Sequence, residues 1–313
     1  MHPASPPPML RAAGLTMTYP NGVTALAGLT VDVPAGSVGL VGANGAGKTT
    51  LFRLMLGLMR PTQGALEVAG HRVDSDPVAV RSRLGYMPEH DCLPLDQTAA
   101  DVVSTFGELA GLPVRAARQR ASDVLDLVGL DEARFRPVGG FSTGMRQRTK
   151  LAQALVADPQ LVLLDEPTAG LDPLGREEML ELVGRLAGFG ISAILATHLL
   201  DDVQRVCQNV VMIDRGHLVL AGPIDQLMQT TGYMRVEVGG RDDAVAVLAQ
   251  ALAAHGVTTT PVDDHHIDVD TQVHGDVTFD LVRDAVADLG LRLYAVSTRH
   301  RSLDDVFLQE AYR

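Results

Sequence analysis

The glycine-rich segment at residues 42–49 reads Gly-Ala-Asn-Gly-Ala-Gly-Lys-Thr and constrains the fold more than any other part of the chain. The run 38–41 before it is short and apolar, as a buried parallel strand should be. Glycines allow the backbone to wrap closely around phosphates, and a helix that begins near Lys48 adds the positive end of its dipole. A chance glycine-rich turn would rarely match all eight positions in this context. The segment therefore predicts an α/β fold with a P-loop that binds a nucleoside triphosphate.

The side chains of this loop have separate expected roles. Lys48 places a point charge at the outer phosphates, and the Thr49 hydroxyl can ligate Mg²⁺. Only two of the 26 lysine and arginine residues are lysines, Lys48 and Lys150, so a compact ammonium in the loop is unusual for this chain. The residues expected to bind nucleotide here are Gly42, Asn44, Gly45, Ala46, Gly47, Lys48, Thr49 and Thr50.

A second apolar run, Leu161–Leu164, is followed by two carboxylates, Asp165 and Glu166. Four apolar residues fit a central strand that is buried on both faces. The carboxyl ends of such strands are where ligands bind in open α/β sheets. We expect Asp165 to hold Mg²⁺, directly or through water, and Glu166 to orient or deprotonate the attacking water. An acidic helix cap is the alternative, and the P-loop makes it the weaker one.

Residues 141–148, just upstream of that run, read Phe-Ser-Thr-Gly-Met-Arg-Gln-Arg. A serine at a helix N-terminus can form an anion site, although the stretch alone could be a capped amphipathic helix. With these motifs in this order, residues 9–222 resemble the nucleotide-binding subunit of an ABC transporter of the drug-export (daunorubicin-resistance-like) subfamily. The resemblance implies that Ser142 and Gly144 contact the γ-phosphate of ATP bound to the opposite subunit.

The same resemblance implies roles for three further residues. Tyr19 matches the aromatic residue that stacks on adenine, although a lone tyrosine is more often packing. Asp172, in the segment 169–172, matches the loop that links the two ATP sites. His198 matches the switch histidine that touches the γ-phosphate, although a lone histidine after a strand is ordinarily a satisfied surface residue.

The chain departs from the family pattern in two places. Glu89 stands where the family usually has glutamine, and because a carboxylate can also ligate Mg²⁺, we expect activity to be kept. The lead-in 36–42 is one residue shorter than usual, and we expect the turn at residues 35–36 to absorb the loss, since a deletion within a strand would flip its side chains. The resemblance implies Lys48, Glu166 and His198 as catalytic residues and Thr49, Glu89 and Asp165 as metal ligands.

Composition limits the classes of protein that this chain can belong to. A length of 313 residues suggests about two domains, and a net charge of −12 argues against a nucleic-acid binder. No apolar run approaches the roughly 18–20 residues that span a bilayer, and no secretory signal is recognisable. Cys92 and Cys207 are far apart without metal-ligand spacing, which fits a reducing cytosol.

The resemblance implies a cassette built from a RecA-like α/β core, an antiparallel β subdomain and an α-helical subdomain at about 97–150. The helical part should meet a membrane subunit, a role that rests on resemblance; a plain packing insertion is the alternative. The expected elements are short strands over 9–33 around Asn21-Gly22, the P-loop helix over 49–59, strands over 63–88, helices over 97–135 and alternating helices and strands over 143–222.

A second unit is expected from about residue 233. Its pattern is β-α-β-β-α-β, the order of a small α+β ferredoxin-like domain. Residues 302–305 resemble a capping box that starts a last helix. His265, His266 and His274 lack a ligand cluster and are expected to be surface histidines. The expected divisions are a flexible Pro-rich tail at 1–8, the cassette at 9–222 and an accessory domain at 232–313.

Together these features predict a cytosolic ATPase subunit that binds ATP and Mg²⁺ and works as a head-to-tail homodimer. By resemblance, it would power export of a drug or other amphipathic solute through a separately encoded integral-membrane permease, on the cytoplasmic face of the membrane. One alternative is a non-transport ABC ATPase that acts on ribosomes or nucleic acid. Another is a small-molecule kinase, which leaves residues 141–148 and His198 unexplained.

Overall fold

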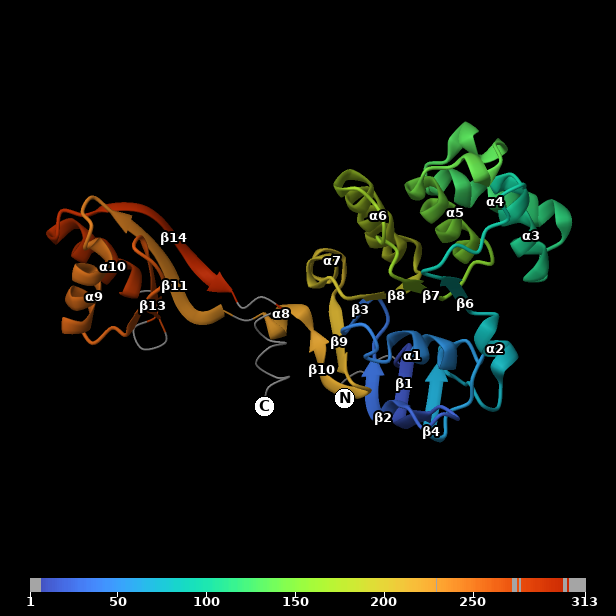
Figure 1. Ribbon diagram of the computed structural model, residues 1–313, viewed down its shortest axis with the longest axis horizontal. Helices are drawn as coiled ribbons and strands as arrows, with labels where there is room; N and C mark the ends of the chain where they lie inside the picture. Colours follow the sequence, from blue (N-terminus) through green and yellow to red (C-terminus); the bar gives the residue numbers. More distant parts are fainter. Residues whose placement is uncertain (1–6, 229, 272–274, 276, 301–302, 304–313) are drawn as a thin grey trace, which may run out of the picture. The chain divides into compact units, whose positions relative to one another are not determined.

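The computed structural model describes residues 7–228, 230–271, 275, 277–300 and 303 (Figure 1). The chain divides into two compact units, with the boundary between Ile224 and Asp225. Most of the expected tail at 1–8, and the last helix expected from residues 302–305 except Leu303, lie outside the described residues. Within the described ranges, none of the helices combines the length and the apolar character needed to cross a membrane.

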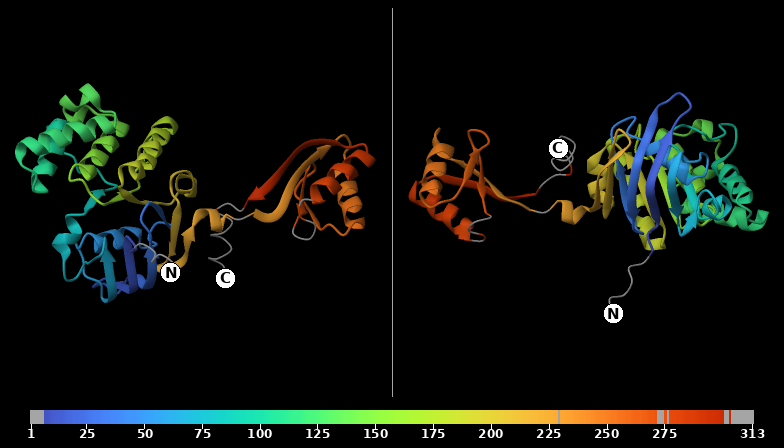
Figure 2. Two further views of the ribbon diagram at one scale, coloured as in Figure 1. Left: turned by 180° about the vertical axis from the view of Figure 1, so that it is seen from behind. Right: turned by 90° about the horizontal axis from the view of Figure 1, so that it is seen from below.

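An antiparallel sheet forms one layer of the first unit, with strand order β2-β1-β4-β5. Its strands alternate between buried and exposed residues because one face covers the core. The β1–β2 hairpin (Figure 2) turns at the expected dipeptide, where Gly22 has φ 85° and its N–H donates to the Tyr19 carbonyl at 2.9 Å. The strands are β1 (Leu10–Thr18), β2 (Thr24–Val33), β4 (Gln63–Val68) and β5 (His71–Arg72).

The central sheet of the first unit has six strands in the order β10-β9-β3-β8-β7-β6. All neighbouring pairs are parallel except β9 and β10, and every residue of β3, β7 and β8 is buried. The carboxyl ends of the parallel strands therefore meet at one edge. The strands are β3 (Ser37–Val41), β6 (Leu84–Met87), β7 (Leu161–Asp165), β8 (Ser192–Thr197), β9 (Asn209–Asp214) and β10 (His217–Pro223).

Helices of the first unit pack around this sheet, and three of them form a separate lobe. That lobe consists of α3, α4 and α5, which pack against one another (Figure 1). The helices are α1 (Lys48–Met55), α2 (Pro77–Arg81), α3 (Ala99–Leu109), α4 (Val114–Leu127), α5 (Thr143–Leu155), α6 (Pro173–Arg185) and α7 (Leu200–Val206), with short 3₁₀ helices at Asp131–Phe135, Val138–Gly140 and Leu186–Phe189. A further helix, α8 (Ile224–Leu227), crosses the boundary between the two units.

Two expected elements differ from the structure. The P-loop helix ends at Met55 rather than at residue 59, because the chain turns through Gly57 at φ 66°. The stretch expected to hold only strands contains α2. Asp76 caps this helix by accepting a hydrogen bond from the Ala79 N–H, and Pro77 occupies its first turn.

The second unit contains β11 (Thr230–Gly239), α9 (Ala244–Ala254), β12 (Thr259–Pro261), β13 (His266–Asp270), α10 (Val277–Asp288) and β14 (Arg292–His300). These elements follow the β-α-β-β-α-β order expected from the sequence. Their antiparallel sheet has the strand order β12-β13-β11-β14, and apolar side chains between the sheet and the helices form a separate core. The ferredoxin-like assignment of this unit remains a prediction.

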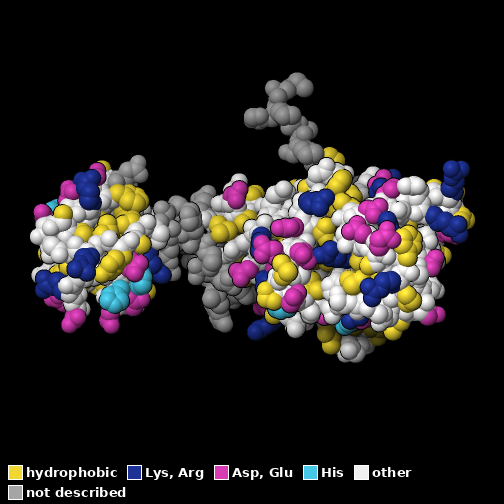
Figure 3. Space-filling view, turned by 90° about the horizontal axis from the view of Figure 1, so that it is seen from above, with side chains coloured by type: hydrophobic (Ala, Val, Ile, Leu, Met, Phe, Trp, Pro, Cys, Tyr) yellow, Lys and Arg dark blue, Asp and Glu magenta, His cyan; other side chains and the backbone are white. Residues whose placement is uncertain are grey.

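The surface is chemically mixed on the face seen from above in Figure 3, where Lys and Arg side chains are scattered among acidic and hydrophobic ones. In the second unit, His265 is exposed and His266 Nδ1 lies 2.8 Å from Asp263 Oδ1. His274 lies outside the described residues.

Candidate nucleotide-binding and hydrolysis site

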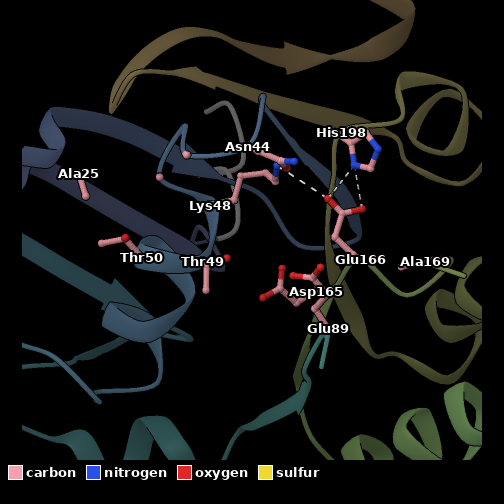
Figure 4. A pocket seen from close by; sticks show the side chains of 12 residues that line it. Ala25, Asn44, Lys48, Thr49, Thr50, Glu89, Asp165, Glu166, Ala169 and His198 are labelled. Carbon is pink, nitrogen blue, oxygen red and sulfur yellow. Dashed lines mark hydrogen bonds and ion pairs between the residues drawn. The ribbon is translucent and has the colours of Figure 1, made fainter. Parts of the chain in front are cut away.

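Four neighbouring strands deliver the predicted polar residues to one edge of the central sheet. The P-loop follows β3, His198 follows β8, Asp165 and Glu166 end β7, and Glu89 follows β6. Because β3, β8, β7 and β6 are consecutive in the sheet, these side chains line a single pocket of about 230 Å³ (Figure 4). This is the position at which open α/β sheets bind ligands.

Close backbone contacts shape the P-loop. A Cβ atom at Gly42 would lie 2.4 Å from the Ile213 carbonyl oxygen, and one at Gly47 would lie 2.6 Å from that of Ala25. Gly47 also has a backbone φ of 116°, which residues with a side chain rarely adopt. Helix α1 then begins with neither a side-chain cap nor an acidic residue in its first turn. Its N-terminal N–H groups and dipole are therefore suited to a phosphate.

The Lys48 ammonium is buried at the centre of the pocket. Its Nζ donates to the Gly42 carbonyl at 2.5 Å and lies 3.8 Å from Glu166 Oε1. Burial lowers the pKa of Lys48, and the nearby carboxylates of Glu166, Asp165 and Glu89 oppose this effect. The group is a desolvated cation surrounded by anions, so it suits the negative charge of a triphosphate.

Glu166 adopts a backbone conformation that is unusual for a side-chain-bearing residue. Its φ is 47°, in the left-handed region, and its N–H donates to the Ala196 carbonyl at 2.9 Å. Such strain costs on the order of 1–3 kcal/mol and tends to occur at functional sites. The carboxylate lies 3.0 Å from Nδ1 of His198, which comes from the neighbouring strand (Figure 4).

The adjacent carboxylate, Asp165, has a different environment. Its Oδ2 accepts a hydrogen bond from the Tyr86 hydroxyl at 3.4 Å. Burial raises the pKa of Asp165, and the charges of Glu89 and Glu166 raise it further, while Tyr86 and Lys48 act in the opposite direction. Burial, together with Asp165, raises the pKa of Tyr86 to about 12. A cation bound beside Asp165 would relieve this repulsion.

The oxygen donors fit a Mg²⁺ ion that shares its coordination with phosphates. Asp165 and Glu89 lie side by side across from Thr49 (Figure 4). Among the residues that the structure describes, no three His, Cys, Asp or Glu side chains are arranged to hold a metal by themselves. Mg²⁺ is commonly held by one or two carboxylates together with substrate phosphates, so a hydroxyl and two carboxylates suffice.

Ten of the predicted residues line this pocket, together with two that were not predicted. The predicted ones are Asn44, Gly45, Gly47, Lys48, Thr49, Thr50, Glu89, Asp165, Glu166 and His198. Gly42 and Ala46 do not line it but lie within the loop that does. Ala25 was missed because only long-range packing brings it there, whereas Ala169 lies three residues after Glu166 and begins the segment 169–172 that was expected to link the two ATP sites.

Tyr19 stands beside the pocket rather than in its lining. Its hydroxyl lies 3.1 Å from Oγ1 of Thr50, which does line the pocket, and 3.8 Å from the sulfur of Met59. The ring is partly buried against the hydrophobic core. Tyr19 therefore lies next to α1, and its expected contact with adenine remains a prediction.

Comparisons with known proteins agree with this geometry. The family model described as ABC transporter matches residues 26–169. The daunorubicin resistance ATP-binding protein DrrA3 of Streptomyces coeruleorubidus is 35% identical over 285 residues, which cover 91% of this chain and 90% of that protein. This chain belongs to the ABC transporter ATP-binding proteins. As a member of that family it is an ATP hydrolase.

Other ABC proteins support the same assignment. The daunorubicin/doxorubicin resistance ATP-binding protein DrrA of Streptomyces peucetius is 36% identical, over 71% of this chain and 68% of that protein. Among solved structures, cbiO1 from Clostridium perfringens, part of the ABC transporter complex cbiONQ, is 28% identical with a TM-score of 0.65. The match covers 71% of this chain and 91% of that one.

The remaining predicted residues of the ABC cassette line a second pocket. Ser142, Gly144 and Asp172 lie there, and none of them lines the P-loop pocket. Ser142 caps α5, where its Oγ accepts from the Met145 N–H at 3.2 Å, and Asp172 caps α6, where its Oδ1 accepts from the Gly175 N–H at 3.0 Å. The chain thus presents two separate sets of polar groups.

Proposed function

We propose that this ABC ATPase works as a head-to-tail pair in which each ATP lies between two copies of the chain. The observation that carries this proposal is the separation of the predicted nucleotide residues into two pockets. Lys48, Thr49, Asp165 and Glu166 belong to the P-loop pocket, and Ser142 belongs to the other. Because one chain contains both sets, a homodimer is sufficient.

A hydrogen bond links α5, whose first residues line the second pocket, to the loop that lines the P-loop pocket. The side-chain Nε2 of Gln147, on α5, donates to the Ala169 carbonyl at 3.1 Å. Gln147 is buried, and Ala169 lines the P-loop pocket. The helix that would contact the partner's nucleotide is therefore attached to the loop that follows Glu166. This contact supports a cycle in which ATP closes the pair and hydrolysis opens it.

Hydrolysis at such a site needs positioning and charge stabilisation more than covalent chemistry. Lys48 and the N-terminus of α1 would bind the phosphates. Glu166, held between Lys48 and His198, would orient the attacking water and accept its proton. Thr49, Glu89 and Asp165 would hold Mg²⁺, which supplies positive charge at the phosphates when it is bound. His198 would keep Glu166 in place and approach the γ-phosphate.

The proposed use of this ATPase is export of a drug or another amphipathic solute. The names of the relatives, which are daunorubicin resistance ATP-binding proteins, support this use. We propose a separately encoded integral-membrane permease as partner, contacted through residues 89–135, with the chain peripheral on the cytoplasmic face of the membrane. Exposed apolar side chains in that region, including Leu95, Leu109 and Phe135, are consistent with such a contact.

Purification from membranes tests this use. An affinity-tagged chain is solubilised in mild detergent, and the proteins that accompany it are identified. We expect an integral-membrane protein to co-purify, and reversal of charge at Asp101 or Glu108 to weaken transport while hydrolysis persists. Co-sedimentation with ribosomes and no membrane protein would instead support the non-transport alternative.

We also propose that residues 232–313 form an accessory domain and that the cassette covers 9–222. A separate hydrophobic core in the second unit supports this division. A chain that ends at Gly222 should then remain folded and bind ATP. A thermal melt with and without ATP measures this. Aggregation of the shortened chain, with no ATP-dependent shift, would show that the second unit completes the cassette.

A further inference from the structure

The second lysine of the chain, Lys150, is buried in α5, with 1% of its surface exposed. Its Nζ donates to the carbonyl oxygens of Pro88 at 2.9 Å and Glu89 at 2.8 Å, and lies 3.5 Å from that of His90. An ammonium group has three N–H donors, so this one side chain matches three successive backbone acceptors. Bonds to a charged donor are stronger than those between neutral groups.

Two further side chains of α5 meet the same loop. Arg146 Nε lies 3.7 Å from Asp91 Oδ2, and Gln153 Oε1 lies 4.0 Å from Cys92 Sγ. Positions 146, 150 and 153 share one face of the helix. The contacts therefore form a row along α5, with the buried ammonium in the middle, and the row faces residues 88–92.

The loop held in this way carries Glu89 to the P-loop pocket. Residues 89–92 are themselves exposed, so their own burial does little to fix the loop. Behind them, β6 lies very close to α5, because a Cβ atom at Gly85 would lie 2.0 Å from the Ala154 carbonyl oxygen. The backbone at Glu89 is thus tied to the same helix that Ser142 caps.

We propose that Lys150 is a positioning residue that couples α5, the helix that Ser142 caps, to the carboxylate of Glu89. Movement of α5 would carry the loop with it, and the Glu89 carboxylate would approach or leave the metal. This inference rests on the proposed role of Glu89 as a metal ligand. Lys150 itself touches neither nucleotide nor metal and acts through the three carbonyl groups.

Nucleotide binding measured with and without metal tests this coupling without relying on turnover. In a Glu166→Gln background, calorimetry gives the affinity for ATP in Mg²⁺ and in EDTA, and their ratio is the Mg²⁺ enhancement. We expect Lys150→Met to lower this enhancement roughly tenfold, as loss of a partner outside the ligands commonly does, while affinity in EDTA changes little. Glu89→Ala should lower it similarly, and the double variant should be no worse than Glu89→Ala.

Hydrogen exchange supplies a second readout. Peptides that cover residues 88–92 should exchange faster in Lys150→Met than in wild type, without any nucleotide. Lys150→Arg keeps a charged donor and should recover part of the protection and of the enhancement. Arg120→Met is the matched control, since it removes a cation that pairs with Asp158 at 2.7 Å, away from the loop. It should leave both readouts unchanged.

Three other outcomes would contradict the coupling of Lys150 to Glu89. If Glu89→Ala lowers the enhancement but neither Lys150 variant changes it, Lys150 does not position Glu89. If the losses of Lys150→Met and Glu89→Ala multiply in the double variant, Lys150 acts independently of Glu89 and the coupling is wrong. If Glu89→Ala leaves the enhancement intact, the metal role of Glu89 fails first, and the coupling fails with it.

Discussion

The Nδ1 atom of His198 lies 3.0 Å from Oε1 and 3.2 Å from Oε2 of Glu166. The two residues come from the ends of neighbouring strands, and Lys48 lies on the other side of the carboxylate at 3.8 Å. Glu166 is nearly buried, whereas the His198 side chain is 53% exposed. The carboxylate is therefore held by two nitrogen atoms while its histidine partner remains accessible from the pocket.

This arrangement predicts the effect of Glu166→Gln. The amide keeps the size of the side chain but cannot accept a proton from water, so hydrolysis should fall by roughly 10²–10⁴-fold. ATP binding should persist, because Lys48 and the P-loop, which are proposed to bind the phosphates, are unchanged. Phosphate release and equilibrium binding measure the two effects. Asp158→Asn, which also converts a carboxylate to an amide but at an exposed position, is the control. Near-normal turnover in Glu166→Gln would show that Glu166 does not take part in hydrolysis.

Asp165 should lower the stability of the nucleotide-free protein. Folding raises the pKa of this acid, so its ionised form destabilises the folded state. The loss of folding free energy is therefore complete at pH values above the folded-state pKa. The cost disappears as the pH falls toward the ordinary value of 3.8. Asp165→Asn should therefore melt higher at neutral pH, by about 2–4 °C per kcal/mol relieved, and this gain should shrink in acid.

Thermal melts from pH 8 to pH 4 measure that difference, and ATP binding in Mg²⁺ measures its functional cost. Asp32→Asn is a suitable control, because Asp32 is an exposed acid paired with Arg11. A lower melting temperature for Asp165→Asn at neutral pH would contradict the unfavourable charge cluster. Unchanged Mg²⁺-dependent binding would contradict the metal role of Asp165.

Tyr19 offers a test of the adenine contact. If the ring stacks on the base, Tyr19→Ala should weaken ATP binding by about 1–3 kcal/mol, the usual worth of such stacking. Binding of inorganic tripolyphosphate should not change, because it has no base. Tyr19→Phe removes only the hydroxyl near Thr50 and should keep most of the affinity. Equal losses for both ligands would show that Tyr19 supports α1 rather than adenine.

The motifs predicted the pocket well because they mark where parallel strands end. Glu89, Asp165 and His198 each follow a short apolar run, and parallel strands bring such positions to one edge. The order of strands was not needed for this prediction. Helix ends were harder to predict. The predicted P-loop helix runs past Met55, although Gly57 is a stop signal for a helix. Helix α2 was not predicted, although Asp76-Pro77 is a helix-start pattern.

Contacts between distant segments could not be predicted from local patterns. The sequence marked Lys150 only as the second of two lysines, and its carbonyl acceptors lie about 60 residues earlier in the chain. Ala25 reaches the pocket through the packing of the antiparallel sheet against the P-loop, which no periodicity reports. Such residues follow from tertiary packing, whereas the P-loop and the strand-end carboxylates are fixed by their immediate neighbours.

Mixing two inactive variants tests the composite site most directly. Lys48→Ala removes the charge proposed to bind phosphate, and Ser142→Arg blocks the pocket that is proposed to face the partner's nucleotide. Each alone should lack ATPase activity, and Ser142→Arg should still bind ATP. In a mixed dimer, the intact Lys48 of one chain meets the intact Ser142 of the other. Activity should therefore rise, to at most about one quarter of wild type for an equal mixture. Activity that stays at the sum of the two separate variants would contradict the head-to-tail account.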